Sequence, residues 1–282
     1  MSAWNEKIKD ICGMLQLELH PQAVKMLTDE DEIPASAIKA GEKYGHLAYC
    51  QAQALAKRDG MTVYMGKNDH WCWATLVGFG MVDCSPESPA YETLMPFLGL
   101  KDVSKAPEFF AEFPMFPYGK YSGTVVGPAE TADFEPDVIL INCNNNFQLR
   151  TLFRAIKNQT GKMLDVQFEA LDSCVYTVVK SILTGEYTVA IPDPGDQERA
   201  LATNNEIILG VPFSRLDELY DGMLEMEKGF GSYKSARICM EYDYPRPPFY
   251  NRLFELWGLE KGRDWSFEAS PGIAIANNDI MN

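Results

Sequence analysis

The chain has 282 residues, of which 46% are hydrophobic and 23% are charged, so it can bury a core and is not expected to be disordered. The 40 acidic residues against 25 basic ones give a formal net charge of −15. A body this acidic repels phosphate backbones and anionic lipids, so we expect no nucleic acid and no membrane among its partners. No basic segment followed by an apolar stretch is visible at the N-terminus, and no apolar run approaches the roughly 18 residues that span a bilayer. We therefore expect a cytoplasmic protein.

Helices and strands are expected to alternate along the first 228 residues. Apolar spacing and turn residues predict helices at 3–17, 47–58, 149–157, 169–183 and 216–228. They predict strands at 23–27, 61–65, 121–127, 137–142 and 187–191. The prolines of the aromatic segment 109–118 argue against a regular helix there. This alternation indicates an α/β or α+β fold with a partly parallel sheet.

A weak internal repeat runs through this alternation. A helix that starts at Cys50 turns at Gly60 into a strand, and a helix that starts at Cys174 turns at Gly185 into another. Each strand then leads into a polar loop, at 66–72 and at 193–199. Chance is the alternative explanation, because units of helix, glycine and strand are common.

The repeat suggests a domain organisation. We expect one duplicated domain, residues 1–228, with two pseudo-symmetric βαβ-type halves, roughly 1–120 and 121–228, around a mixed sheet. Residues 229–282, rich in proline and aromatic residues, are expected to form a C-terminal extension packed on it. A ligand site is expected in the cleft between the halves, where such sites usually form.

Three of the seven cysteines, Cys50, Cys72 and Cys174, are the candidate metal ligands. An odd number of scattered cysteines argues against a disulfide framework. Thiolates that converge from separate elements could hold zinc or an iron–sulfur cluster, although no Cys-x-x-Cys pair occurs in the chain. The alternative is that Cys50 and Cys174 start their helices and pack as small apolar side chains, with some thiolate character from the helix dipole.

The densest chemical cluster is Asp69-His70-Trp71-Cys72. A cysteine nucleophile here would use His70 or Asp69 as its base, which defines a thiol-dependent enzyme. The alternative is a turn whose Trp71 and Cys72 pack inward.

Two polar segments are candidates for binding an anionic metabolite. Asn144, Asn145 and Asn146 follow an apolar strand and precede a helix, where a ligand or an ordinary helix cap is expected. In the second segment, Arg199 could clamp a carboxylate, and Asp196 lies three residues before it. The alternative for this second segment is a solvated loop with a surface ion pair.

The chain resembles the ArCR family, a prokaryotic family of unknown function that is common in archaea and anaerobic bacteria. The resemblance lies in Cys50-Gln51, the Cys72 loop, Phe134-Glu-Pro-Asp-Val, the 162–191 stretch with Cys174, and the 196–199 loop followed by Gly210-Val-Pro. It covers roughly residues 10–228 and implies a fold and a family but no activity. Members of the family often carry Pro-Gly-Gly after the cysteine of the first loop, whereas Cys72 is followed by Trp73-Ala74-Thr75.

Three functions remain open from the sequence. The first is a cofactor- or metal-binding protein, redox-active in one version, with a central cleft lined by Cys50, Cys72 and Cys174. The second is a binding module for an anionic small molecule without catalysis, and the third is the thiol-dependent enzyme. Motifs of dinucleotide, P-loop, α/β-hydrolase and zincin proteins are absent from the sequence. The ligand, a homo-oligomeric state and the presence of catalysis stay open.

Overall fold

The computed structural model describes residues 2–168, 171–230 and 248–259. The chain divides into two compact units, residues 1–224 and 225–282, which are treated separately. The strands are β1 (Gln22–Leu27), β2 (Ile38–Lys39), β3 (Val63–Gly66), β4 (Gly123–Pro128), β5 (Val138–Cys143), β6 (Thr188–Ala190) and β7 (Ile207–Pro212). The helices are α1 (Ala3–Leu15), α2 (Ala40–Lys43), α3 (Tyr49–Asp59), α4 (Trp73–Gly78), α5 (Pro89–Leu94), α6 (Ala106–Glu112), α7 (Asn146–Thr160), α8 (Ser173–Val175), α9 (Ser181–Thr184), α10 (Pro194–Ala200), α11 (Leu216–Phe230) and α12 (Pro248–Trp257).

The seven strands form one sheet in the order β2-β3-β4-β1-β5-β7-β6. Strands β2 and β3 pair in parallel, and every other neighbouring pair is antiparallel. The sheet is therefore mixed, as the sequence predicts, and the fold is of the α/β or α+β class. Only one short pair is parallel, because most of the connections return the chain to the opposite direction.

The two halves of the sheet share one strand order. In the first half β4 lies between β1 and β3, and in the second half β7 lies between β5 and β6. In each half the last of these three strands to appear in the chain is the one inserted between the other two. The halves meet at the antiparallel contact of β1 with β5, in which Ala23 faces Ile139. The superposition of the halves about a pseudo-twofold axis stays a prediction.

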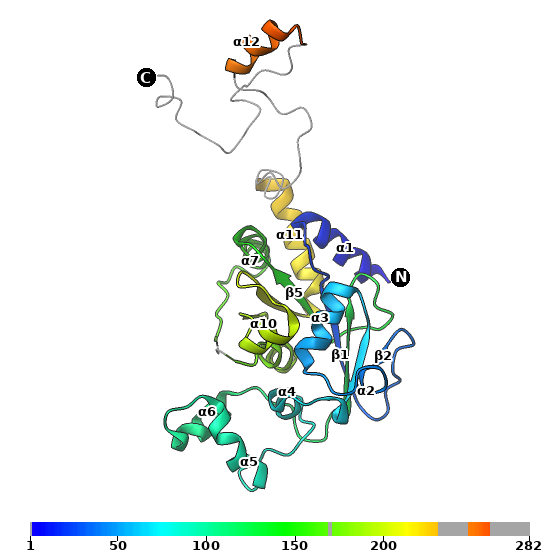
Figure 1. The fold of residues 1–282 in the computed structure, drawn as a ribbon, viewed down its shortest axis with the longest axis vertical. Helices are drawn as coiled ribbons and strands as arrows, with labels where there is room; N and C mark the ends of the chain where they lie inside the picture. The colour runs from blue at the N-terminus through cyan, green and yellow to red at the C-terminus, as the bar shows by residue number, and fades with distance from the viewer. Residues whose placement is uncertain (1, 169–170, 231–247, 260–282) are drawn as a thin grey trace. The chain divides into compact units, whose positions relative to one another are not determined.

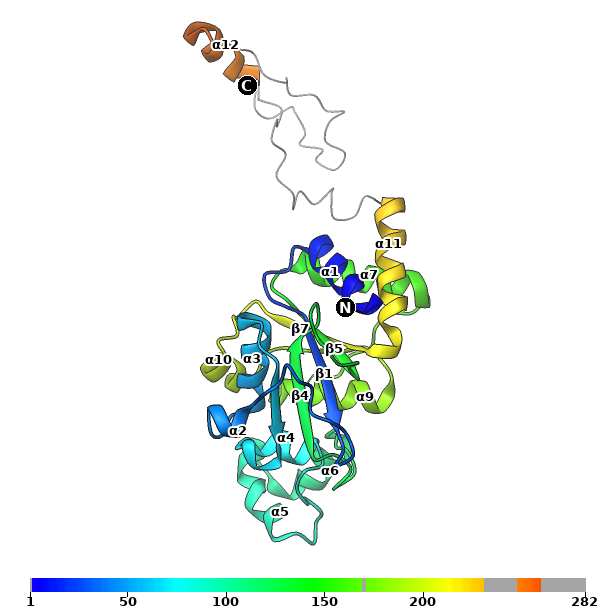
Figure 2. The same cartoon turned by 90° about the vertical axis from the view of Figure 1, so that its right-hand side faces the viewer.

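Helices cover both faces of the sheet (Figures 1 and 2). Strand β5 shows this best, because all of its residues are buried, as expected for an interior strand. Its Val138 and Leu140 pack in one apolar cluster with α3, α4 and the helical segment from α8 onward. Its Ile139 and Ile141 pack in a second cluster with α1, α7 and α11. In Figure 2, α3 and α10 lie side by side, apart from α1, α7 and α11.

Two glycines end helices where the repeat predicts turns. Gly60 follows α3 with φ +66°, and Gly185 follows α9 with φ +66°. This left-handed conformation favours glycine, which has no Cβ to clash with the backbone. Both helices therefore stop at the predicted residue and lead into β3 and β6.

Two predicted elements of the second half differ from the structure. The segment 193–199, predicted as a polar loop, forms α10, because Asp193 caps the helix and Pro194 occupies its first position. The helix predicted over 169–183 begins at Ser173, and its middle turn η4 (Tyr176–Lys180) is π-helical. The sequence did not reveal this wider turn, which lies close to β7. A Cβ on Gly210 would lie 2.7 Å from the carbonyl oxygen of Thr177.

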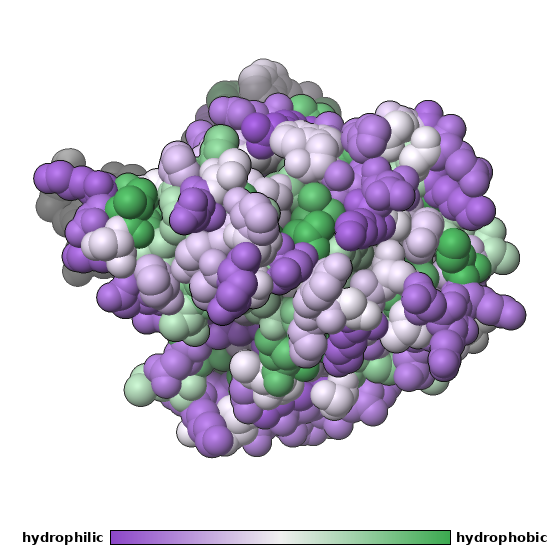
Figure 3. All heavy atoms as spheres, turned by 90° about the horizontal axis from the view of Figure 1, so that it is seen from below, coloured by the Kyte–Doolittle hydropathy of each residue, from purple (hydrophilic) through white to green (hydrophobic). Residues whose placement is uncertain are grey.

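The loops and short helices between β3 and β4 gather at one end of the first unit. Figure 1 shows α5 and α6 there, beyond α4. Seen from this end, the surface is mostly hydrophilic, with small separate hydrophobic patches (Figure 3). The prolines argue against a regular helix at 109–118, but residues 109–112 form the end of α6. The prediction is therefore wrong for these four residues, and the helix stops at Glu112, two residues before Pro114. No helix in the described ranges is long and apolar enough to cross a membrane.

Of the second unit, the structure describes residues 225–230 and 248–259. Helix α12 carries an exposed Arg252–Glu255 ion pair at 3.1 Å and a ring contact between Phe254 and Trp257. Most of the predicted extension 229–282, with Cys239, lies outside the described residues.

Candidate functional site

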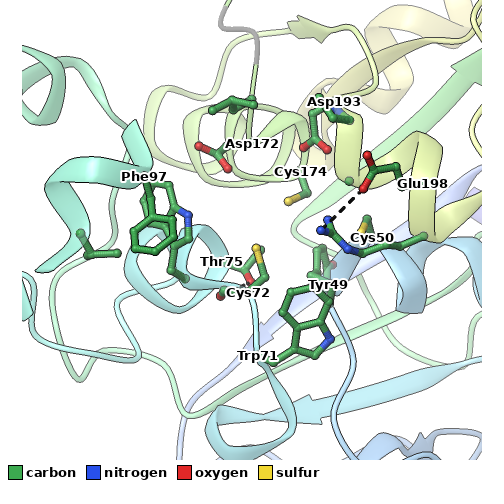
Figure 4. A pocket seen from close by; sticks show the side chains of 17 residues that line it. Tyr49, Cys50, Trp71, Cys72, Thr75, Phe97, Asp172, Cys174, Asp193 and Glu198 are labelled. Carbon is green, nitrogen blue, oxygen red and sulfur yellow. Dashed lines mark hydrogen bonds and ion pairs between the residues drawn. The ribbon is translucent and has the colours of Figure 1, made fainter. Parts of the chain in front are cut away.

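A cavity of about 540 Å³ opens where four helices of the first unit begin. Its walls come from the first turns of α3, α4, α8 and α10, together with α5 and η2 (Met95–Leu98). We call this cavity the thiol pocket because Cys50, Cys72 and Cys174 all line it (Figure 4). Its lining residues fall within 48–97 and 171–199, so both halves of the sheet domain contribute to it. A cavity of this size falls in the range of small-molecule sites.

Each of the three thiols stands at the start of a different helix. Cys50 is the second residue of α3, Cys72 is the N-cap residue of α4, and Cys174 is the second residue of α8. Cys50 and Cys174 are buried, whereas Cys72 is partly exposed. The sequence predicted a cleft lined by these three cysteines, and the structure brings them to one cavity.

The environment keeps these thiols protonated. Burial, aided by the charges of Asp196 and Asp193, raises the pKa of Cys50 to about 12. Burial also raises the pKa of Cys174 well above its ordinary value. For Cys72, burial outweighs the amides of Ala74 and Thr75, which lower the pKa, and the net shift is upward. Burial therefore acts against the thiolate character expected from the helix dipole.

Paired carboxylates join the starts of α8 and α10. The carboxylate of Asp193 accepts hydrogen bonds from the amides of Asp196, at 2.9 Å, and Ser173, at 3.2 Å. The carboxylate of Asp196 accepts from the Asp193 amide, at 2.9 Å, and from the Ser173 hydroxyl. Burial, and then the charge of Asp193, raises the pKa of Asp196 to about 6. Asp193 lines the pocket, and Asp196 lies beneath it as a support.

Arg199 is the cation of the pocket. Its guanidinium lies 5.0 Å from the centre of the Trp71 ring, which lines the same cavity. It also forms a loose ion pair with Glu198 at 3.8 Å, drawn as the dashed line in Figure 4. A Cβ on Gly195 would lie 2.8 Å from its nitrogen, so the side chain passes close to the first turn of α10.

Asp69 and His70 are engaged elsewhere. The carboxylate of Asp69 accepts a hydrogen bond from the amide of Gly66 at 2.8 Å. The His70 ring packs between aromatic rings, 6.1 Å from Tyr49, and its Nδ1 lies 3.4 Å from the Thr75 hydroxyl. Burial lowers the pKa of His70 to about 4, so the ring is neutral. Among the described residues its Nε2 has no hydrogen-bond partner. The base roles of Asp69 and His70 toward Cys72 stay predictions.

The three asparagines lie away from the thiol pocket. Asn145 caps α7 by accepting a hydrogen bond from the Gln148 amide at 3.0 Å. An ordinary helix cap was the alternative to ligand binding in the sequence analysis. Asn144 donates to Glu18 at 2.8 Å, and Asn146 lines a separate open hollow along α7. The structure therefore does not bring Asn144–Asn146 together with Arg199. Their ligand-binding role stays a prediction.

Within the described ranges, no group of three or more His, Cys, Asp or Glu side chains is arranged to hold a metal ion. Cys50, Cys72 and Cys174 share a cavity but do not make such a group. The expectation of zinc or an iron–sulfur cluster gains no support from this arrangement.

The sequence missed several residues of the pocket. Asp172 is buried at its wall with φ +64°, and Phe97 and Leu94 supply apolar surface. Asp172 stands two residues before Cys174, and Ala48, which also lines the pocket, stands two residues before Cys50. The internal repeat could therefore have marked Asp172. No signal marked Phe97 and Leu94, which reach the cavity through a long connection between strands.

Fold and pocket together define a mixed α/β protein with one antiparallel-rich sheet and a cavity lined by neutral thiols, carboxylates and one arginine. The model of one protein family, described as uncharacterised ArCR (DUF169), matches residues 10–222. The chain belongs to this family, as the resemblance in its motifs implied. No curated protein and no solved structure matched the chain in the same comparisons.

Proposed function

We propose that this protein binds a small organic molecule in the thiol pocket. The observation that carries the proposal is the cavity of about 540 Å³. The starts of four helices line it, and these helices come from both halves of the sheet domain. Binding sites of this kind are concave and mostly apolar, with a few polar groups that orient the ligand. Here the apolar surface comes from Trp71, Trp73 and Phe97, and the polar groups are Asp172, Asp193 and Arg199.

Binding without catalysis is favoured over thiol-dependent catalysis. A cysteine nucleophile needs a lowered pKa or an adjacent base. Burial raises the pKa of Cys72 instead, and His70 faces Thr75 with its pKa lowered to about 4. The pocket is therefore best suited to hold a ligand or an organic cofactor.

The proposal is tested with the full chain and a library of cellular metabolites. The melting temperature is measured with each compound, because a ligand that binds only the folded state raises it. Hits are then titrated by calorimetry against wild type and Cys72→Phe, in which the added ring fills the cavity. Cys84→Phe is the matched control, since Cys84 is also partly exposed but lines a different hollow.

We expect at least one compound to stabilise wild type and Cys84→Phe but not Cys72→Phe. Circular dichroism of the unliganded variants shows whether each one is folded. If Cys72→Phe does not fold, Trp71→Ala, which removes an exposed wall residue, replaces it. Hits that bind all variants equally, or the absence of any hit, would overturn the proposal.

A redox-active cofactor or metal protein is the second candidate, because three thiols face one cavity. Its test is anaerobic purification followed by an absorption spectrum and elemental analysis of one sample. Visible absorption with stoichiometric iron, or bound zinc, would favour this candidate. A colourless sample free of metal would argue against this candidate and favour the binding of an organic ligand.

A further inference from the structure

Positive and negative groups both line the thiol pocket. Figure 4 shows Asp172 and Asp193 on one side and Trp71 on the opposite side, with Phe97 and Glu198 at the two ends. The guanidinium of Arg199 lies between these sides, because it is 5.0 Å from the Trp71 ring and a Cβ on Gly195 would lie 2.8 Å from its nitrogen and 2.9 Å from an Asp193 oxygen. A ligand in the cavity therefore meets a guanidinium and carboxylates that lie close together, as the two charges of an α-amino acid do.

Arg199 has hydrogen-bond donors to spare for a carboxylate. Its central carbon lies over the Trp71 ring, and its five N–H donors point outward in the guanidinium plane. Its ion pair with Glu198 is long, at 3.8 Å, and both side chains are solvent-accessible, so a bidentate carboxylate competes well with it.

The carboxylates of the pocket are suited to an ammonium group. The Asp193 oxygens each accept one backbone hydrogen bond, which leaves a lone pair on each for another donor. The carboxylate of Asp172 lines the same wall and is buried. A purely anionic ligand would bring its charge close to these two carboxylates, and a purely cationic one would lie close to Arg199.

The remaining surface is apolar. Phe97 and Leu94 line the pocket, and Phe97 is 63% exposed, so its ring is accessible to a ligand. The thiols of Cys50, Cys72 and Cys174 are kept protonated and add no charge. One part of the ligand is therefore expected to be apolar.

We infer that the ligand of the thiol pocket is a zwitterion of the α-amino-acid type with an apolar side chain. Its carboxylate pairs with Arg199, its ammonium group lies against Asp172 and Asp193, and its side chain packs on Phe97 and Leu94. This inference rests on the proposed function and names the ligand class of the same site.

The test uses L-phenylalanine, L-leucine and L-methionine with the full chain. For each amino acid that binds, the amine without its carboxylate and the acid without its ammonium are titrated by calorimetry; for L-phenylalanine these are phenethylamine and 3-phenylpropionate. We expect at least one amino acid to bind, and both of its analogues to bind at least about tenfold more weakly, since each loses one charged contact.

Two variants assign the contacts. Arg199→Gln should weaken amino-acid binding about tenfold and leave the binding of the amine unchanged. Asp172→Asn should weaken amino-acid binding and spare the acid, and asparagine tolerates the left-handed conformation of this position. Arg150→Gln, on an exposed arginine of α7 outside the pocket, is the matched control and should change neither.

The outcomes separate this inference from the proposed function. If no amino acid binds but a library compound binds and is blocked by Cys72→Phe, the zwitterion is wrong and the binding function stands. Analogues that bind as tightly as the amino acid, or an Arg199→Gln variant with unchanged affinity, also overturn the inference. If no compound of either set binds through the pocket, both proposals fail.

Discussion

The ammonium of Lys57 lies 2.8 Å from the carboxylate of Glu206, and both side chains are almost completely buried. This ion pair fastens the end of α3 to the segment before β7, across the two halves of the sheet. Glu206 also accepts a hydrogen bond from Asn142 on β5, at 3.0 Å. Burial acts to raise the pKa of Glu206, but the hydrogen bond and charge of Lys57 and the other donors together lower it.

Breaking this pair should cost more than breaking a surface pair. We expect Glu206→Gln to lower the free energy of unfolding by about 3 kcal/mol, because it leaves the Lys57 charge buried without its counterion. Urea denaturation measures the loss. The control is Glu6→Gln, which removes the exposed Lys9–Glu6 pair and should cost no more than about 1 kcal/mol. Equal losses in the two variants would contradict the ranking.

The raised pKa of Asp196 predicts a pH dependence of stability. A carboxyl group that binds its proton more tightly in the folded state makes stability fall as pH rises from its unfolded pKa, about 4, to its folded pKa, about 6. Asp196→Asn removes this titration and keeps an acceptor for Ser173. The variant should therefore gain melting temperature relative to wild type between about pH 4 and about pH 7.

Alkylation of the cysteines should follow exposure. With iodoacetamide near neutral pH, Cys84 and Cys72, which are partly exposed, should react before the buried Cys50, Cys143 and Cys174. The buried thiols are protonated because burial raises their pKa, and they should react only when the chain unfolds. Peptide mass spectrometry follows each site. Alkylation of Cys72 faster than free glutathione would contradict this order and favour a thiol-dependent enzyme.

Two helical glycines form a matched pair with opposite expected effects. A Cβ on Gly222 of α11 would lie 2.4 Å from the carbonyl oxygen of Ala155 on α7, so Gly222→Ala should push the helices apart and cost roughly 1–3 kcal/mol. A Cβ on Gly13 of α1 would meet nothing within 4 Å. Gly13→Ala should therefore stabilise the fold by roughly 0.5–1 kcal/mol. Denaturant titration of both variants checks the two signs.

The elements of the sheet could be predicted because their signals are local. The apolar run of β5 and the glycine stops at Gly60 and Gly185 depend on residues close together in sequence. The direction of the strands could not, since it depends on how the chain returns across the sheet. Helix α10 was missed because its polar residues resemble those of a loop. Its cap residue, Asp193, also accepts a hydrogen bond from Ser173 of α8, a contact that the local sequence does not show.

The candidate site was predictable in part. The repeat pointed to Cys50 and Cys174 as equivalent positions, and both line the pocket. The protonated state of their thiols could not be predicted, because it depends on burial that only the folded chain creates. The hydrogen bond that the carboxylate of Asp69 accepts from the Gly66 amide could not be predicted either, because it also depends on the folded chain.

The strand order also has a consequence during synthesis on the ribosome. The three strands β1, β4 and β3 are complete once residue 128 has been made, so the first of the two halves can assemble its hydrogen bonds early. The second half joins it through the short pairing of Gln22–Val24 with Val138–Leu140. The part of the pocket wall formed by α8 and α10, within residues 171–199, is synthesised after the rest of the pocket. A nascent chain therefore has no thiol pocket until both halves have emerged, and ligand binding reports a finished fold.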